Sequence, residues 1–211
     1  MAGDRPRIFT LIGCPMIGTL GPESKIVEHE PCETCETEYP DEVTFLDYQF
    51  DTWEQAELVK ADTTTYAMTR RLYERFQAAR LRGLSMRPMK TSRSSIFADI
   101  DPDNKVVVPE FVQWLIPGKA DGPSGWWERS GLCPECGRII WKSTPRVADA
   151  LFAKYSEKAG PPRQVSASTW QGEDAFFLTD PGPPLVTERF TKVAEQEKVS
   201  GLILDPAEWV E

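Results

Sequence analysis

Histidine is almost absent from this chain of 211 residues, and His29 is the only one. A single histidine excludes the HExxH protease motif, histidine-based catalytic triads and metal centres built on two histidines. The GxSxG turn of the α/β-hydrolases, the GxGxxG dinucleotide loop and a complete Walker loop are missing as well. Because no pattern typical of a common enzyme class is present, we expect the protein not to be an enzyme.

Basic residues are also in short supply. The chain has 24 Lys and Arg against 33 Asp and Glu, which gives a net charge of −9 and a pI near 4.8. Proteins that bind the phosphate backbone need a basic face, so the composition argues against a nucleic-acid partner. An acidic surface attracts a cationic partner, although the same charge also serves solubility alone.

Long apolar runs are absent too. Nothing approaches the roughly 18 apolar residues of a membrane-spanning helix, so no membrane partner is expected. The first apolar run, residues 9–17, is short and is interrupted by Gly13 and Pro15. It predicts a strand, over residues 7–12, and not a secretory signal. We therefore expect a cytoplasmic protein.

Cysteine is sparse, with 5 residues, but four of them form two CxxC motifs: Cys32 with Cys35, and Cys133 with Cys136. Two intervening residues allow one tight turn, a knuckle, to direct both sulfurs at the same ion. Two knuckles complete a tetrahedral thiolate site. The sequence therefore predicts a structural Zn²⁺ held by these four residues, closing a loop of about one hundred residues.

The cysteines allow other interpretations. Disulfides remain possible, although an odd and low cysteine count suits thiols or a metal better. A thioredoxin-type pair would follow an apolar strand, which the acidic segment before Cys32 is not. A zinc deaminase would need a His-x-Glu motif on an earlier element, but His29 lies three residues before Cys32. Cys14 is expected to be a small buried apolar residue.

An internal repeat covers residues 52–88 and 169–206. At a constant offset, Asp62 matches Asp180, Thr69 matches Thr187, Arg71 matches Arg189, Gly83 matches Gly201 and Pro88 matches Pro206. Each copy predicts a strand, a helix capped by the threonine, and a second strand. The helices are expected to end at the glycines and the second strands at the prolines.

The remaining segments complete a predicted α+β fold. Residues 43–50, 96–100 and 105–116 are expected to be strands, the last two joined by a turn at residues 101–104, and residues 147–155 a helix. We predict one compact unit over residues 1–211. In it, the duplicated strand–helix–strand units are joined by a zinc ribbon made from residues 28–40 and 128–142.

Several motifs together resemble a known family. They are the two cysteine motifs, the segment Thr-x-Arg-Leu-x-x-Arg-Phe at residues 69–76, and the segments at residues 172–176 and 186–190. Over roughly residues 30–206 the chain is similar to the double-CxxCG proteins of myxobacteria, which are understood as immunity proteins of swarming-inhibition toxin systems. The resemblance implies that the protein binds a cognate toxin domain, expected to be basic, and occludes its active site. Cys35 is followed by Glu36 and not by glycine, so the first knuckle is expected to differ in detail.

Two alternatives stay open. A zinc-ribbon adaptor or regulator that binds nucleic acid or the transcription machinery would present a basic patch near Arg138, Lys142 and Arg146. A hydrolase without a recognisable motif would show a deep cleft with convergent polar groups. For a basic protein partner, the best candidate surface is the acidic run around the first knuckle: Glu28, Glu30, Glu33, Glu36, Glu38, Asp41 and Glu42.

Overall fold

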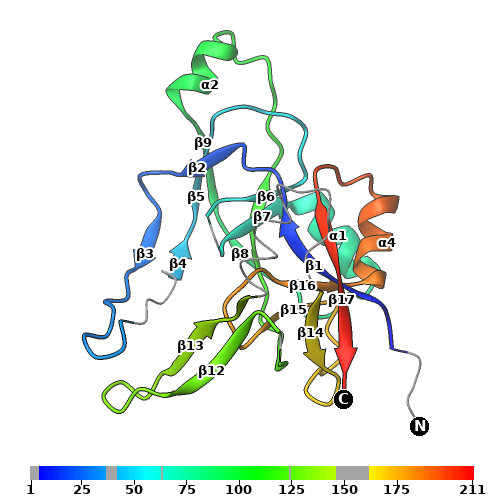
Figure 1. Ribbon diagram of the computed structural model, residues 1–211. Coiled ribbons are helices and arrows are strands. Elements are labelled where there is room, and N and C mark those ends of the chain that lie inside the picture. Colours follow the sequence, from blue (N-terminus) through cyan, green and yellow to red (C-terminus); the bar gives the residue numbers. More distant parts are fainter. Residues whose placement is uncertain (1–4, 37–41, 63, 124, 146–161) are drawn as a thin grey trace.

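The computed structural model describes residues 5–36, 42–62, 64–123, 125–145 and 162–211 (Figure 1). The largest sheet has six strands, in the order β11 (Lys119–Ala120), β15 (Ala175–Leu178), β16 (Leu185–Thr187), β1 (Ile8–Gly13), β17 (Ile203–Val210) and β14 (Arg163–Ser166). A second sheet has four, in the order β6 (Leu58–Lys60), β7 (Tyr66–Thr69), β10 (Phe111–Leu115) and β8 (Ser85–Pro88). In the first sheet β1 lies between β16 and β17, and in the second sheet β10 lies between β7 and β8. Neither β1 nor β10 is next in sequence to the strands on its two sides.

Three smaller sheets extend this body. One has the order β2 (Gly18–Leu20), β5 (Asp47–Phe50) and β9 (Lys90–Arg93). Two hairpins pair β3 (Lys25–Val27) with β4 (Glu42–Phe45) and β12 (Trp127–Leu132) with β13 (Ile139–Ser143). The described helices are α1 (Arg70–Ala78), α2 (Ser95–Ile100) and α4 (Glu188–Gln196). None of them is long and apolar enough to cross a membrane. The fold is thus mixed, mostly strands with a few short helices.

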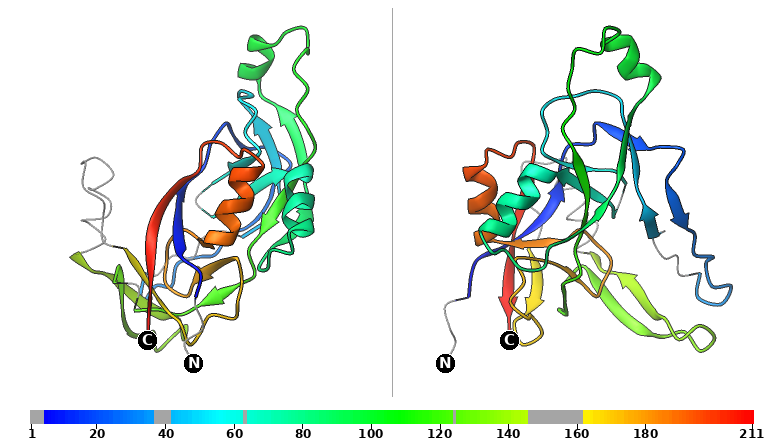
Figure 2. Two further views of the ribbon diagram at one scale, coloured as in Figure 1. Left: turned by 90° about the vertical axis from the view of Figure 1, so that its right-hand side faces the viewer. Right: turned by 180° about the vertical axis from the view of Figure 1, so that it is seen from behind.

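Helices α1 and α4 pack against each other and against both main sheets (Figure 2). The rings of Phe76 and Phe190 are 4.8 Å apart between centroids, and Trp114 of β10 stacks on Phe190 at 5.7 Å. Buried aromatic side chains contribute much of the stability of a protein core, because each removes a large apolar area from water. One continuous apolar cluster therefore joins elements of the N-terminal and C-terminal parts of the chain.

The helix starts follow the expected chemistry, but the helix ends do not. The hydroxyl of Thr69 accepts from the backbone N–H of Leu72, and that of Thr187 accepts from Phe190. Both helices end before their glycines, because Arg80 (φ 55°) and Lys198 (φ 58°) already adopt the left-handed conformation that stops a helix. Gly83 and Gly201, also left-handed, belong to the turns that follow.

Other boundaries differ from the sequence-based expectations. Residues 96–100 were expected to be a strand, but α2 forms there because the Ser94 hydroxyl accepts from the N–H of Phe97. Within residues 105–116 only Phe111–Leu115 is a strand, and residues 43–50 are divided between β4 and β5. Strand β17 continues past Pro206 because β14 pairs with its C-terminal half. The expected helix at residues 147–155 lies outside the described residues.

Candidate metal centre

The two cysteine motifs lie at the turns of the two hairpins. Cys32 and Cys35 follow β3, and Cys133 and Cys136 lie between β12 and β13. Both hairpins extend from the same side of the body (Figure 1). In each hairpin the CxxC motif lies in the connection between two antiparallel strands. The backbone hydrogen bonds of those strands therefore support the position of the cysteines.

The four sulfur atoms gather in one cluster. The Sγ atoms of Cys32 and Cys133 are 3.8 Å apart, those of Cys35 and Cys136 are 3.9 Å apart, and all four lie within 4.8 Å of one another. The residues of each pair are 101 positions apart in the sequence. None of the four forms a disulfide. The structure thus brings together all four predicted ligands.

The spacing of the sulfurs fits a metal ion. A zinc–thiolate bond of about 2.3 Å in tetrahedral geometry implies sulfur–sulfur edges of about 3.8 Å. A disulfide would need about 2.05 Å. The distances of the Cys32–Cys133 and Cys35–Cys136 pairs match the edges of such a tetrahedron, so the donor set suits a thiolate-bound cation.

The two knuckles share one turn geometry. The backbone N–H of Glu36 donates to the carbonyl of Cys32 at 2.7 Å, and the N–H of Gly137 donates to that of Cys133 at 2.9 Å. Glu36 (φ 51°) and Gly137 (φ 70°) are both left-handed. The two knuckles thus share this hydrogen bond and the left-handed residue that follows it, and Glu36 adopts that conformation at a cost of about 1–2 kcal/mol for an L-residue.

The knuckles also contact each other through their central residues. The hydroxyl of Thr34 donates to the carboxylate of Glu135, which also lies 3.9 Å from the sulfur of Cys32. Desolvation, together with smaller contributions from hydrogen bonds with the other three thiols, raises the pKa of the Cys136 thiol to about 11. A cation that binds here must displace thiol protons, so its affinity will fall as the pH is lowered.

Cys14 stands apart from this cluster. It packs against the main apolar cluster, and burial raises the pKa of its thiol to about 12. A thiol that stays protonated is a poor ligand and a poor nucleophile. It is partly buried, whereas a buried small apolar residue was expected, and it does pack against apolar neighbours.

A buried ion pair and an open groove were not expected from the sequence. Arg163 is 1% exposed, and its guanidinium donates to Asp180 Oδ1 and to the carbonyl of Pro183, each at 2.7 Å. An open groove of about 800 Å³ runs beside the β12–β13 hairpin, with Trp127 and Trp141 in its wall. Both tryptophans are partly buried and line this groove. Neither feature has a motif or a spacing that could reveal it.

Comparison with known proteins adds no assignment. No protein-family model matches the chain, and no curated protein matches it significantly.

Proposed function

We propose that this protein is an immunity protein that binds a cognate toxin domain and occludes its active site, with a structural zinc ion holding its scaffold. The observation that carries the proposal is the closed set of four cysteine sulfurs. Structural zinc sites use four protein ligands, whereas catalytic sites keep a position for water or substrate. A metal ion bound by four thiolates at this place would make the binding scaffold more rigid. It would have no open position for a reactive water.

Donor chemistry supports zinc as the ion. Thiolates select zinc, copper(I) and iron–sulfur clusters, and a tetrahedral set of four suits zinc or iron. Zinc is redox-inert, so it suits a purely structural role. Cys32, Cys35, Cys133 and Cys136 would hold it as a zinc ribbon assembled from the two hairpins. The ion would join segments that are otherwise far apart in the chain.

We also propose that the scaffold is a duplication larger than the sequence repeat. Thr69 pairs with Phe111 and Pro88 with Val112 in one sheet, while Thr187 pairs with Ile8 and Pro206 with Phe9 in the other. Thr69 and Pro88 match Thr187 and Pro206 in the repeat alignment, so β10 and β1 pair with their neighbours in the same register. We call residues 1–103 the first half and residues 104–211 the second half. Strand β10 of the second half lies between β7 and β8 of the first half. Strand β1 of the first half lies between β16 and β17 of the second half, which are the equivalents of β7 and β8.

Side chains follow the same relation. Arg71 of α1 contacts Glu57 and Glu197, the C-cap of α4, whereas Arg189 of α4 contacts Asp174 and Ala79, the C-cap of α1. The backbone N–H of Arg70 donates to Glu110, and that of Glu188 donates to Arg7, each at 2.8 Å. The pattern supports two halves that exchange their first strand and each contribute one knuckle.

The net charge supports a basic partner. At −9, the protein would attract a cationic toxin domain and speed its capture. Toxins that act on nucleic acids commonly carry such a charge because they must approach phosphate. The adaptor alternative needs a basic face, which the acidic residues around the first knuckle do not provide.

Co-expression with a toxin domain tests the function. The toxin domain encoded by the neighbouring reading frame would be induced in a sensitive host with and without this protein. We expect survival only when both are present, and a stable complex on purification. If cells die equally fast in both cases, the immunity proposal is wrong. An unrelated toxin domain serves as the specificity control.

A further inference from the structure

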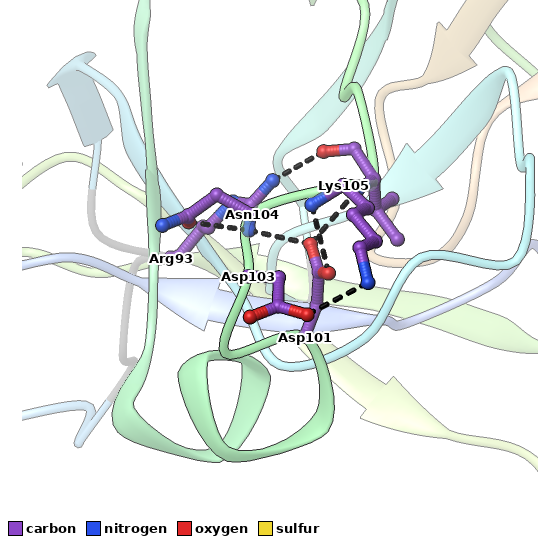
Figure 3. Close-up of polar contacts among 6 residues, drawn as sticks. Arg93, Asp101, Asp103, Asn104 and Lys105 are labelled. Carbon is purple, nitrogen blue, oxygen red and sulfur yellow. Dashed lines mark hydrogen bonds and ion pairs between the residues drawn. The ribbon is translucent and has the colours of Figure 1, made fainter.

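The sulfur cluster joins the tips of two projecting hairpins. The loop of residues 94–110 projects from the body as well, but a polar network fixes it, in which the Arg93 guanidinium donates to Asp101 at 2.8 Å (Figure 3). The hairpin tips are joined instead by the four cysteines and by the hydrogen bond from Thr34 to Glu135. The chemical state of the thiols therefore bears directly on how the two tips are held together.

Each sulfur has a neighbour on the opposite hairpin. The Sγ atom of Cys32 lies 3.8 Å from that of Cys133, and the Sγ atom of Cys35 lies 3.9 Å from that of Cys136. A disulfide has an S–S length of about 2.05 Å, so each pair must approach by roughly 2 Å. Shared between the two partners this is a movement of about 1 Å for each sulfur, which side-chain rotation supplies.

Exposure to solvent distinguishes the two cross-hairpin pairs. Cys136 is exposed and Cys35 is partly exposed, whereas Cys133 is only 1% exposed. The oxidation of a cysteine depends on its thiolate character and on its access to solvent. Metal ligands are already thiolates, so access decides among them. A dissolved oxidant therefore reaches both sulfurs of the Cys35–Cys136 pair before it reaches both sulfurs of the Cys32–Cys133 pair.

We propose that the four-cysteine centre is also an oxidation site, at which hydrogen peroxide joins Cys35 to Cys136 and then Cys32 to Cys133. The cross-link replaces the ion as the joint between the hairpins, and it connects residues 101 positions apart. The scaffold therefore keeps its tips together when oxidation removes the metal. The inference rests on the geometry of the sulfurs and is independent of the immunity function.

The oxidation balances with peroxide as the two-electron acceptor. The Cys136 thiolate attacks one oxygen of hydrogen peroxide, the O–O bond breaks, and the hydroxide that leaves takes up a proton to become water. This gives a sulfenic acid at Cys136. The Cys35 thiolate then attacks that sulfur, the S–S bond forms, the S–O bond breaks, and the second hydroxide is protonated to water. Cys32 and Cys133 remain as two thiolates, too few to hold a structural ion tightly.

Peptide mapping tests the cross-link. The metal-loaded protein would be treated with hydrogen peroxide, its remaining thiols alkylated, and the monomer isolated by size and digested with trypsin. Both cysteines of each knuckle lie on one tryptic peptide, residues 26–60 or residues 130–138. A cross-hairpin disulfide joins these two peptides, whereas a disulfide within a knuckle leaves them separate. We expect the joined peptides, together with release of the metal to a colorimetric chelator.

Two results of this mapping would overturn the proposal. One is a pair of separate peptides, each with a disulfide inside its own knuckle. The other is oxidation to sulfinic or sulfonic acids without joined peptides. Protein that carries no metal after purification would be reduced and oxidised in the same way, so the cross-link is tested whether or not zinc is the ion. Neither result bears on the immunity proposal, which co-expression tests separately.

Variants test which pair reacts first. With one equivalent of peroxide, Cys35→Ser and Cys136→Ser should each lower the yield of joined peptides at least about fivefold, because the accessible pair is gone. Cys14→Ala, whose thiol packs against the main apolar cluster, should react as the unmodified protein does. Equal yields in all three variants would refute the assigned pair.

Urea denaturation gives a readout that does not depend on the variants. After removal of the metal, the oxidised protein should unfold at a higher urea concentration than the reduced protein, because the cross-link restricts the unfolded chain. Dithiothreitol should abolish the difference. Equal midpoints for the two forms would show that no joint has replaced the ion.

Discussion

The cluster of four cysteines was predictable from the sequence at the scale of residues, whereas the buried ion pair was not. Ligand spacing is local, because a CxxC turn must direct two sulfurs at one point whatever the rest of the chain does. Arg163 and Asp180 have no such signal, since their contact depends on which strands meet. The burial of Arg163 can be recognised only once its surroundings of low dielectric constant and its partner Asp180 are known.

Removal of one thiol tests the metal centre. Cys133→Ser should lose the bound metal and lower the free energy of unfolding by several kcal/mol, since structural metal binding contributes directly to folding. Metal content of the purified protein and urea denaturation would measure the two effects. Cys14→Ala is the matched control, because that thiol contacts the core and not the cluster, and it should keep its metal. Equal metal content and equal midpoints in Cys133→Ser would refute the site.

The residue after each second cysteine allows a finer test. Glu36 holds a left-handed conformation that Gly137 adopts without steric penalty. Glu36→Gly should therefore stabilise the protein by about 0.5–1 kcal/mol, once the greater flexibility of unfolded glycine is subtracted. Gly137→Ala should destabilise it by a similar amount. Thermal unfolding of the metal-loaded variants would measure both; shifts of the same sign would show that the two turns are not alike.

At the scale of elements, the sequence predicted where helices begin more reliably than where they end. Thr69 and Thr187 cap their helices because a hydroxyl at that position satisfies a free backbone N–H. The ends were misplaced because Arg80 and Lys198 adopt a conformation usually left to glycine. Helix α2 was missed because its isoleucines favour a strand by propensity, while the Ser94 cap and the burial of Phe97 decide for a helix.

The two caps should differ in their contribution to stability. Thr69→Ala should cost about 1 kcal/mol, the usual value of an N-cap. Thr187→Ala should cost more, because the Thr187 hydroxyl also donates to the buried Asp174 carboxylate at 2.7 Å, which would lose a partner. Chemical denaturation would rank the two variants. Thr→Ser at each position keeps the hydroxyl and should restore most of the loss; an equal cost for both alanine variants would contradict the assigned role of Asp174.

At the scale of the whole molecule, the sequence showed part of the proposed duplication but not how its halves are connected. The repeat was visible at residues 52–88 and 169–206 because identical turn and cap residues recur at one offset. Strands β1 and β10 share no such residues, and only the pairing register shows that they occupy matching places. Strand partners far apart in sequence leave no local signal, so the proposed exchange could not be predicted.

Division of the chain tests this connectivity. Fragments 1–103 and 104–211, separated between α2 and β10, would each lack one inner strand of their own main sheet, β10 or β1, and half of the proposed metal ligands. Each alone should therefore be unfolded or self-associated, because its sheet would expose two unpaired strand edges around a missing strand. Mixed in the presence of zinc, they should form a one-to-one complex containing one ion. Light scattering and near-ultraviolet circular dichroism would detect it. A 104–211 fragment carrying Cys133→Ser should pair poorly, whereas a stably folded monomer of either fragment alone would show that the strands are not exchanged.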